Sequence, residues 1–451
     1  MAVLAPFRGL TYNFSALAPI HLLVAPPYDV ISEEEQEEYY RSDPRNVIRL
    51  ILGRKKVGDS DWDNRYTRSA DCFRRWQSED VLTRADRPSV YVTTLTYDAG
   101  DGRGARVRWG LIGVVRIEDE GSGVILPHER TFSAHKDDRL RLMRACNAQF
   151  SQIFGLFEDH GERVFQRVKR VLAGPPVVSF EFKDGTRHEM WILQDPPLLA
   201  EISRGLRDER IFIADGHHRY ETSRNFRNLM RARHGRRSSN RSYEFVMMYL
   251  TAMNDPGLTI LPSHRLVRRC AGFHVSSFLE KVEKWFEVAP VPLTQSGRSA
   301  DCRRVQDLLA KKGVSTTAIV FHHHGSPEAY LLSLKPNRRE EMGEDLHPCL
   351  KELDVLVLSR LILQKTLGFG LEDLNNEDLF HYQSDLHKAV SLVDSGIFQM
   401  TFLLNPTRIE QVRDVAGNGL IMPRKSTFFY PKVLSGLVFN RMDPHETLPI
   451  L

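Results

Sequence analysis

The stretch from Ile211 to Ser223, IFIADGHHRYETS, constrains the fold more than any other part of the chain. The apolar or small residues from Ile211 to Ala214 predict a buried strand, and Gly216 can adopt the positive φ of a tight turn. The residues that follow predict a helix, whose first backbone N–H groups are unpaired and attract anions. A strand, a tight turn and a helix in this order suit phosphate or metal chemistry.

Polar side chains crowd the residues after this strand. Asp215 stands at the strand's end, where it could hold a metal ion or the turn itself. His217 and Glu221 share one helix face at i,i+4, and so do His218 and Thr222. These positions predict a cluster of ionisable groups around the start of the helix.

A structural interpretation of the same residues stays open. Asp215 could cap the helix, while the histidines face solvent or bond to carbonyl groups of the core. A cap needs only one polar side chain, however, and Arg219 adds a planar donor fork that suits phosphate. The density of polar groups therefore favours a binding site.

The composition is that of an ordinary globular protein. With 451 residues, 41% of them hydrophobic, the chain is long enough for two or three domains with sizeable cores. The formal charge of +4, from 62 basic and 58 acidic residues, is too balanced to indicate nucleic-acid binding over the whole surface. The basic cluster from Met230 to Arg241 predicts a solvated, mobile loop rather than a nucleic-acid site.

Cysteine usage and hydropathy indicate a cytoplasmic protein. The five cysteines form no CxxC or metal-type spacing, and their odd number favours reduced thiols. The first residues lack the basic and apolar regions of a signal peptide, and no stretch approaches the roughly 18 apolar residues of a membrane span. We expect neither secretion nor membrane insertion.

Hairpins alternate with helices along the chain, which predicts an α+β or mixed α/β architecture. The runs SVYVTTLTYDA and RVRWGLIGVVRIED alternate as strands do, and the glycine-rich residues between them predict a hairpin loop. A turn-rich junction follows Asp255, so we place a domain boundary near 256. Residues 1–255 would form an N-terminal region carrying DGHHR, and residues 256–451 a C-terminal α/β domain.

The DGHHR turn, from Asp215 to Arg219, resembles the phosphate-binding turn of the ParB and sulfiredoxin superfamily. Because His217 stands where sulfiredoxins have their catalytic cysteine, sulfiredoxin chemistry is not expected. The turn looks most like that of the free-serine kinases, in which this loop holds the nucleotide phosphates and the metal. The resemblance implies a ParB/sulfiredoxin-like core with an N-terminal extension.

At full length, the chain resembles a bacterial and archaeal family of unknown function whose hallmark is ADGHHRYET. Five further blocks carry this resemblance: APFRGLTYN, APPYDVIS, HERTFSAHKDDRLRLMRA, LTILPSHRLV and MPRKSTFFYPK. The match spans nearly all residues.

Two of these blocks contain further candidate site residues. In HERTFSAHKDDRLRLMRA, Glu129 could act as a general base, and Lys136 or Arg139 could neutralise developing charge. A solvated charged loop is the alternative. In MPRKSTFFYPK, Lys425 and neighbouring hydroxyls offer donors to an anion, and a strand with solvent-facing lysines is the alternative. The resemblance favours a ligand-facing loop that the C-terminal region contributes to an interdomain site.

The block FHHHG, with histidines at 322, 323 and 324, is interpreted as structural. Adjacent residues of a strand point to opposite faces, so at most two of the three side chains could share one metal ion.

We expect a nucleotide- and Mg²⁺-dependent phosphotransferase that uses ATP or ADP and acts on a small hydroxylated metabolite, with free serine as the best single candidate. Asp215 would hold the metal, and Glu129 would be the base. The expected catalytic residues are Asp215, His217, His218 and Glu129; the phosphate-binding residues are Gly216, Arg219, Thr222, Lys136, Arg139, Lys425 and Ser426; the substrate-binding residues are Glu221 and Thr427.

Two other functions stay open. A phosphatase acting on phosphoserine, or on a similar phosphomonoester, would use Asp215 and the histidines to position water or form a phosphohistidine. A nucleotide-binding regulator would require a nucleic-acid-binding module. The sequence shows no helix-turn-helix and no focused basic face, so nucleic acid is not an expected partner.

Overall fold

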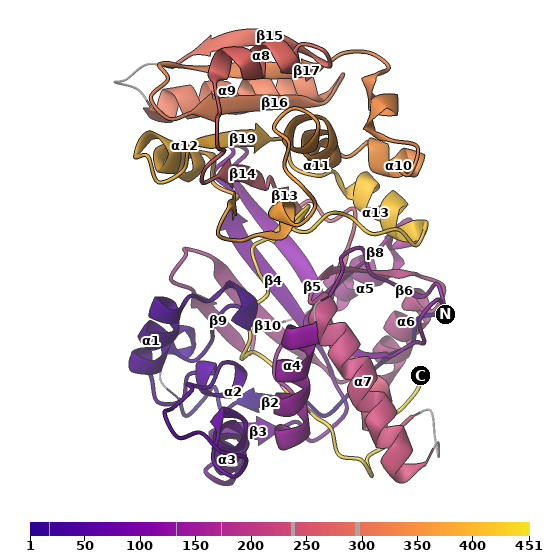
Figure 1. Cartoon of the computed structure of the whole chain (residues 1–451). Helices are drawn as coiled ribbons and strands as arrows, with labels where there is room; N and C mark the ends of the chain where they lie inside the picture. Colours follow the sequence, from indigo (N-terminus) through magenta and orange to yellow (C-terminus); the bar gives the residue numbers. More distant parts are fainter. Residues whose placement is uncertain (18, 132, 173, 236–239, 294–297) are drawn as a thin grey trace. The chain divides into compact units, whose positions relative to one another are not determined.

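Figure 1 shows the computed structural model of the chain, which describes all residues except 18, 132, 173, 236–239 and 294–297. The chain divides into two compact units, unit 1 with Met1–Thr259 and Phe429–Leu451, and unit 2 with Ile260–Phe428. Both units contain helices and sheets, so the predicted mixed α/β class is confirmed. The break after Thr259 lies close to the boundary predicted near 256, whereas the last residues of the chain return to unit 1.

Unit 1 is built on a mixed sheet, which in the described part of the chain has nine strands in the order β6-β11-β8-β12-β5-β4-β10-β9, with β1 beside β5. The pairs β8/β12 and β6/β11 are parallel, and the other pairs are antiparallel. The strands are β1 Leu4–Ala5, β4 Val90–Asp98, β5 Ala105–Arg116, β6 Ile125–Leu126, β8 Ile153–Phe157, β9 Val178–Glu181, β10 Arg187–Leu193, β11 Ile211–Asp215 and β12 Phe245–Ala252. The predicted hairpin is confirmed as β4 and β5, which pair from Tyr91 with Ile112 to Asp98 with Ala105.

Helices and short strands complete unit 1. Helix α4 packs against α3 and α7, which places three helices next to one another (Figure 1). The helices are α1 Glu33–Ser42, α2 Ile48–Ile51, α3 Arg65–Ser78, α4 Ser133–Cys146, α5 Arg163–Val171, α6 Pro196–Leu206 and α7 His217–His234. The short strands are β2 Leu10–Tyr12, β3 Leu82–Arg84, β7 Ala148–Gln149 and β21 Asn440–Arg441. The side chain of Ser32 caps α1, because it accepts from the backbone of Glu35 in a capping box.

The predicted strand and helix of the ADGHHRYET stretch are confirmed as β11 and α7. Four of the five β11 residues are buried, because β8 and β6 flank the strand on both sides. Helix α7 buries a stripe that recurs at three- and four-residue spacing, from His217 through Phe226 to Met230. This packing fixes the start of α7 at the end of β11. Residues 236–239 of the predicted basic loop lie outside the described residues.

Unit 2 contains an antiparallel sheet in the order β15-β17-β16-β19-β14-β18. Its strands are β14 His264–Val267, β15 Phe286–Pro292, β16 Ala318–His323, β17 Glu328–Leu334, β18 Phe380–Gln383 and β19 Met400–Leu404. Its helices are α8 Val275–Val282, α9 Arg298–Gly313, α10 Pro348–Lys351, α11 Asp354–Val357, α12 Leu386–Asp394 and α13 Ile409–Gly417. A π-helical turn, Leu358–Gln364, continues α11. The core packs Val320, Leu331 and Leu403 against Val390.

The structure also bears on the length of the helices and on the state of the cysteines. Within the described ranges, each helix is too short or too polar to cross a membrane. All five cysteines are free thiols.

Candidate functional site

The DGHHR turn depends on glycine at position 216. Gly216 has a φ of 94°, in the left-handed region that other residues adopt with strain. A Cβ atom there would lie 3.0 Å from Cζ of Arg219, because this side chain folds back beneath the turn. Helix α7 has no side-chain cap at this end. Its first N–H groups therefore keep the positive helix end available to an anion.

Asp215 is bound by two cations. One carboxylate oxygen accepts a hydrogen bond of 2.6 Å from Nζ of Lys432, and the other accepts from a guanidinium nitrogen of Arg219. Burial alone would raise the pKa of Asp215, but the attraction of Lys432 and Arg219 outweighs it and holds the pKa well below its usual range. Asp215 is therefore an anion that positions two cations, and not a cap for α7.

Arg219 also ties the turn to strand β8. Its second guanidinium nitrogen donates to the backbone carbonyl of Gln152, just before that strand. The side chain of Arg219 is only 10% exposed. The donor fork predicted to bind phosphate thus holds Asp215 and Gln152 in this structure, beside the cavity described below.

Lys432, which follows the hydroxyls of MPRKSTFFYPK in the loop predicted to offer donors to an anion, is a site residue that was not among the expected phosphate-binding residues. The buried side chain of Arg108 donates hydrogen bonds of 3.1 Å and 2.8 Å to the carbonyls of Tyr430 and Pro431. Arg108 thereby holds the backbone just before Lys432, whose side chain is 15% exposed. The clue available in the sequence was a lysine in one of the blocks on which the family resemblance was inferred.

His217 is buried and neutral. Its Nε2 accepts a hydrogen bond of 3.3 Å from the backbone N–H of His128, which assigns the ring proton to Nδ1. Burial lowers the pKa of His217 well below its usual range, and the neighbouring His128 lowers it further. Nδ1 of His217 lies 3.7 Å from Oε2 of Glu129, whose side chain is 30% exposed. His217 therefore stands behind Glu129 and does not itself face solvent, whereas His218 is half-buried.

The stability of the protein should depend on pH because the imidazole rings of His128 and His217 are buried in the neutral form. Burial lowers the pKa of His128 to about 4 from 6.5, so the folded state binds fewer protons than the unfolded state between these values. The stability from the neutral ring is complete above pH 6.5 and is lost as the pH falls toward 4, by up to about 3 kcal/mol. The free energy of unfolding, measured with urea at several pH values, should therefore rise with pH between 4 and 6.5. His128→Asn should make this slope shallower, because other buried histidines still contribute to it, whereas the exposed His21→Asn should leave it unchanged. Equal slopes in all three proteins would contradict the assignment.

A cavity of about 50 Å³ lies beside the turn and brings three family blocks together. Tyr28 of APPYDVIS, Arg139 of the HERTF block, and Arg219 with Thr222 of α7 all line it. The guanidinium of Arg139 lies 3.9 Å from the ring centre of Tyr28. Arg139 also donates to Asp138 and, at 2.6 Å, to the carbonyl of Ile51. The predicted residues Arg139, Arg219 and Thr222 therefore share one site.

Among the described residues, buried polar atoms without a partner occur at Thr222, which lines the cavity, and at Gln152, which stands in the sequence between the lining residues Ser151 and Ile153. The hydroxyl of Thr222 is fully buried and makes no hydrogen bond among the described residues, and the same holds for both amide atoms of Gln152. Unpaired buried polar groups are costly and are commonly satisfied by water or a ligand. Thr222 was predicted from the sequence, whereas Gln152 was not. Neither a motif nor its spacing marked Gln152.

Lys136 and Glu221 form an ion pair. Nζ of Lys136 lies 2.9 Å from Oε2 of Glu221, and the hydroxyl of Thr131 donates to the same oxygen at 2.7 Å. Burial would raise the pKa of Glu221, but these two hydrogen bonds keep it low. The pair connects the HERTF block to α7. The phosphate-binding role of Lys136 stays a prediction.

Lys425, Ser426 and Thr427 belong to unit 2. Buried Arg265 donates to the backbone carbonyl of Lys425 at 3.1 Å, and the Ser426 hydroxyl donates to the carbonyl of Pro423 at 2.6 Å. The LTILPSHRLV and MPRKST blocks thus meet within this unit. The ligand-binding roles of Lys425, Ser426 and Thr427 stay predictions.

The FHHHG histidines also lie in unit 2. His322 is buried, and its Nε2 is 3.0 Å from a carboxylate oxygen of Asp394. Nδ1 of His324 bonds to the carbonyl of Val393 at 2.9 Å. These contacts agree with the structural interpretation of the block.

The described residues contain no preformed metal-binding cluster. Among the described residues, no group of three or more histidine, cysteine, aspartate or glutamate side chains could hold a metal ion. A metal at Asp215 would compete with Lys432 and Arg219 for its two oxygens. Mg²⁺ often binds through one or two carboxylates and the phosphates of a substrate. The metal role of Asp215 stays a prediction in competition with these ion pairs.

Replacing Gly216 by alanine should destabilise the protein and displace Arg219. The left-handed backbone costs an L-residue about 1–2 kcal/mol. Gly185→Ala is a matched control, because Gly185 has a φ of 78° but no atom within 4 Å of the place that a methyl group would occupy. Gly216→Ala should lose more stability in urea than Gly185→Ala, because it also displaces Arg219, and only Gly216→Ala should lose phosphate binding by calorimetry. Equal phosphate affinity in the two would contradict the role of the turn.

The chain belongs to the family described as Protein of unknown function (DUF1015), whose profile matches residues 4–356. The family resemblance inferred from ADGHHRYET is thereby confirmed. The MPRKSTFFYPK block lies beyond the matched residues. No curated protein matches the sequence.

Three solved structures illustrate the distant likeness that a structural comparison finds. A conserved hypothetical protein from Pyrococcus furiosus has a TM-score of 0.30 and 10% identity over 68% of this chain and 88% of its own. A free serine kinase in complex with AMP has a TM-score of 0.30 and 9% identity, and the match covers 68% of this chain and 83% of the kinase chain. SbnI with a C-terminal truncation, from Staphylococcus aureus, has a TM-score of 0.32 and 11% identity, and the match covers 72% of this chain and 85% of the SbnI chain. These scores describe a distant likeness, and the function is inferred below from the residues of the site.

Proposed function

We propose that the protein is a nucleotide-dependent phosphotransferase that acts on a small hydroxylated metabolite, with free serine as the best single candidate acceptor. The observation that carries the proposal is the pair of cations, Lys432 and Arg219, that Asp215 holds beside the start of α7. Two cations and one carboxylate leave one positive charge in excess, and the helix end adds about half a charge more. This arrangement favours a phosphate group.

The cavity supports a ligand at the same place. The unpaired hydroxyl of Thr222 lines the cavity and can bond to a ligand or to water, and Arg139 adds a further cation. With a volume of about 50 Å³ the cavity admits a small polar group rather than a whole nucleotide. In this proposal the N–H groups after Gly216 hold the phosphates and Lys432 neutralises them, while the cavity takes part of one ligand.

Glu129 is the proposed general base. Its partly exposed carboxylate lies beside His217, whose Nδ1 proton faces it and whose low pKa keeps the ring neutral. The acceptor hydroxyl would transfer its proton to Glu129 while its oxygen forms a bond to the terminal phosphorus. The bond from that phosphorus to the bridging oxygen breaks, and the shortened nucleotide leaves with the electron pair.

Mg²⁺, when it enters with the nucleotide, would neutralise phosphate oxygens. Lys432 and Arg219 are already held in place by Asp215, so these side chains bind and orient phosphate through their own charges.

Phosphoserine formation from serine with ATP or ADP, with and without Mg²⁺, tests the proposal. Lys432→Ala should weaken nucleotide binding about tenfold or more, since a charge-assisted hydrogen bond contributes about 1.5–3 kcal/mol. The exposed Lys56→Ala is the matched control and should bind as the wild type does. Thermal stabilisation by each nucleotide reports binding to the folded state.

Two outcomes would overturn the proposal. If no nucleotide stabilises the wild type and no hydroxylated metabolite is phosphorylated, the turn does not bind a phosphate donor. If phosphate is instead released from phosphoserine without nucleotide, the protein is a phosphatase.

A further inference from the structure

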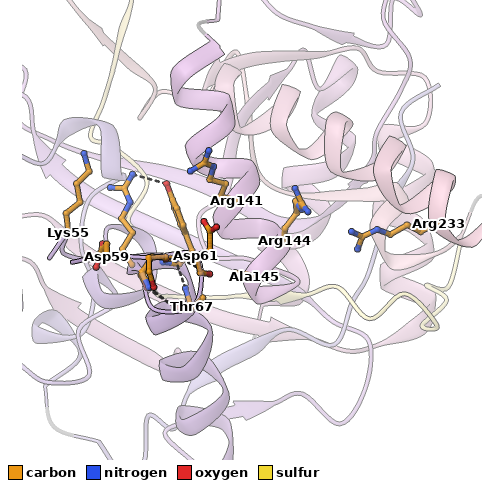
Figure 2. Close-up of a pocket in the computed structure, with 12 residues that line it drawn as sticks. Lys55, Asp59, Asp61, Thr67, Arg141, Arg144, Ala145 and Arg233 are labelled. Atoms are coloured by element: carbon orange, nitrogen blue, oxygen red, sulfur yellow. Dashed lines mark hydrogen bonds between the residues drawn. The ribbon is translucent and has the colours of Figure 1, made fainter. Parts of the chain in front are cut away.

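A large hollow of unit 1 is lined by residues other than those of the DGHHR turn. It has a volume of about 1040 Å³ and is lined by residues of α3, of α4, of α7 and of the segment before α3. Figure 2 shows Arg141, Arg144 and Arg233 spread across one part of this hollow, with Lys55 at another part. We call it the basic hollow and define it by these four cations.

The cations of the basic hollow are not neutralised. Within the described residues, none of the four makes an ion pair, and all are exposed. Two other charges at the hollow are already paired: Arg65 binds Asp138, which lies outside it, and Asp59 binds Arg68 at 2.8 Å. Asp61 is the remaining opposing charge among the lining residues. The hollow therefore carries three positive charges in excess.

Helix α4 separates the basic hollow from the cavity beside the turn. Arg139, Leu142 and Met143 line the small cavity, whereas Arg141, Arg144 and Ala145 line the hollow. These two sets alternate as two faces of one helix. A ligand in the hollow therefore uses different side chains from a ligand at the turn.

We propose that the basic hollow binds a compact anion carrying several phosphate groups. Arginine forks suit phosphate oxygens, and the volume is that of a small-molecule site. Binding of single-stranded nucleic acid would call for open aromatic faces on which bases stack. Among the described residues, Tyr66 is the one aromatic residue that lines the hollow; its hydroxyl donates to Asp138, and the guanidinium of Arg65 lies 5.0 Å from its ring centre.

The arginines of the hollow also correct one expectation from the sequence. Arg141 and Arg144 stand three residues apart in the HERTF block, but Arg233 and Lys55 come from distant segments. Folding alone brings these charges together, so a focused basic face exists that the sequence did not reveal.

Calorimetry of the full chain with inorganic tripolyphosphate at low salt tests the proposal. We expect binding at the hollow to survive Lys432→Ala, which changes only the turn. The double variant Arg141→Ala/Arg144→Ala should weaken binding at the hollow by about tenfold or more. The control Arg163→Ala/Arg170→Ala removes the same charge from exposed positions of α5 and should have no effect. Arg233→Ala, on a different helix, should weaken binding on its own.

Several results would overturn the proposal. If tripolyphosphate does not bind, or if Lys432→Ala abolishes all of its binding, the hollow holds no anion. Equal loss in the hollow variant and the α5 control indicates a general charge effect. An oligonucleotide that binds more tightly than tripolyphosphate through the same arginines identifies a nucleic-acid surface instead. Unchanged melting temperatures of the variants confirm that they fold.

Discussion

Replacing Glu129 by glutamine should lower kcat of the proposed phosphoryl transfer by about 10²- to 10⁴-fold, the usual contribution of a general base. Glutamine has nearly the same shape but cannot accept the proton of the acceptor hydroxyl. Nucleotide affinity should change little, because the base acts on the acceptor in the transition state. Steady-state kinetics with serine, together with nucleotide titration by calorimetry, separates the two effects.

The matched control is Glu79→Gln, which changes an exposed carboxylate at the end of α3. Its kcat should equal that of the wild type. A Glu129→Gln protein that keeps kcat within about threefold would show that another group, or no group, takes the proton. Loss of nucleotide binding in the same variant would instead identify Glu129 as a residue that positions the phosphates.

The local structure of the site was predictable from the sequence. An apolar run, a glycine and a polar helix start are features of neighbouring residues, and β11, Gly216 and α7 follow them closely. The contacts between distant segments were not predictable. Lys432 and Asp215 stand 217 residues apart, and no periodicity links them. The lysine that reaches Asp215 is therefore Lys432, although the sequence directed attention to Lys425.

Burial was the second property that the sequence could not supply. The i,i+4 spacing of His217 and Glu221 places both on one helix face, but it does not say whether that face meets the core or solvent. In the structure His217 is buried and bonded to His128, whereas Glu221 is partly exposed and paired with Lys136. Gln152 gave no signal at all, because the burial of its unpartnered amide follows only from the folded structure.

Arg219→Ala should produce the largest loss of stability among single changes at the site. The side chains of Arg219 and Asp215 are 10% and 15% exposed, so this is a buried ion pair. Removing one partner of such a pair typically costs about 3–5 kcal/mol, because the other charge loses its compensation. Here Lys432 still contacts Asp215, which places the expected loss near the lower end, but the carbonyl of Gln152 also loses its donor. Urea unfolding at neutral pH measures the change.

A double-mutant cycle with Asp215→Asn separates the ion pair from simple loss of packing. If the pair stabilises the turn, Arg219→Ala and Asp215→Asn should be strongly non-additive, with a coupling of about 0.5–3 kcal/mol. Arg170→Ala, at an exposed position of α5, should change stability by no more than about 0.5 kcal/mol. Additive losses in the cycle would mean that Arg219 stabilises the turn through Gln152 alone. The positive charge of Arg219 would then be free for phosphate, as the sequence first suggested.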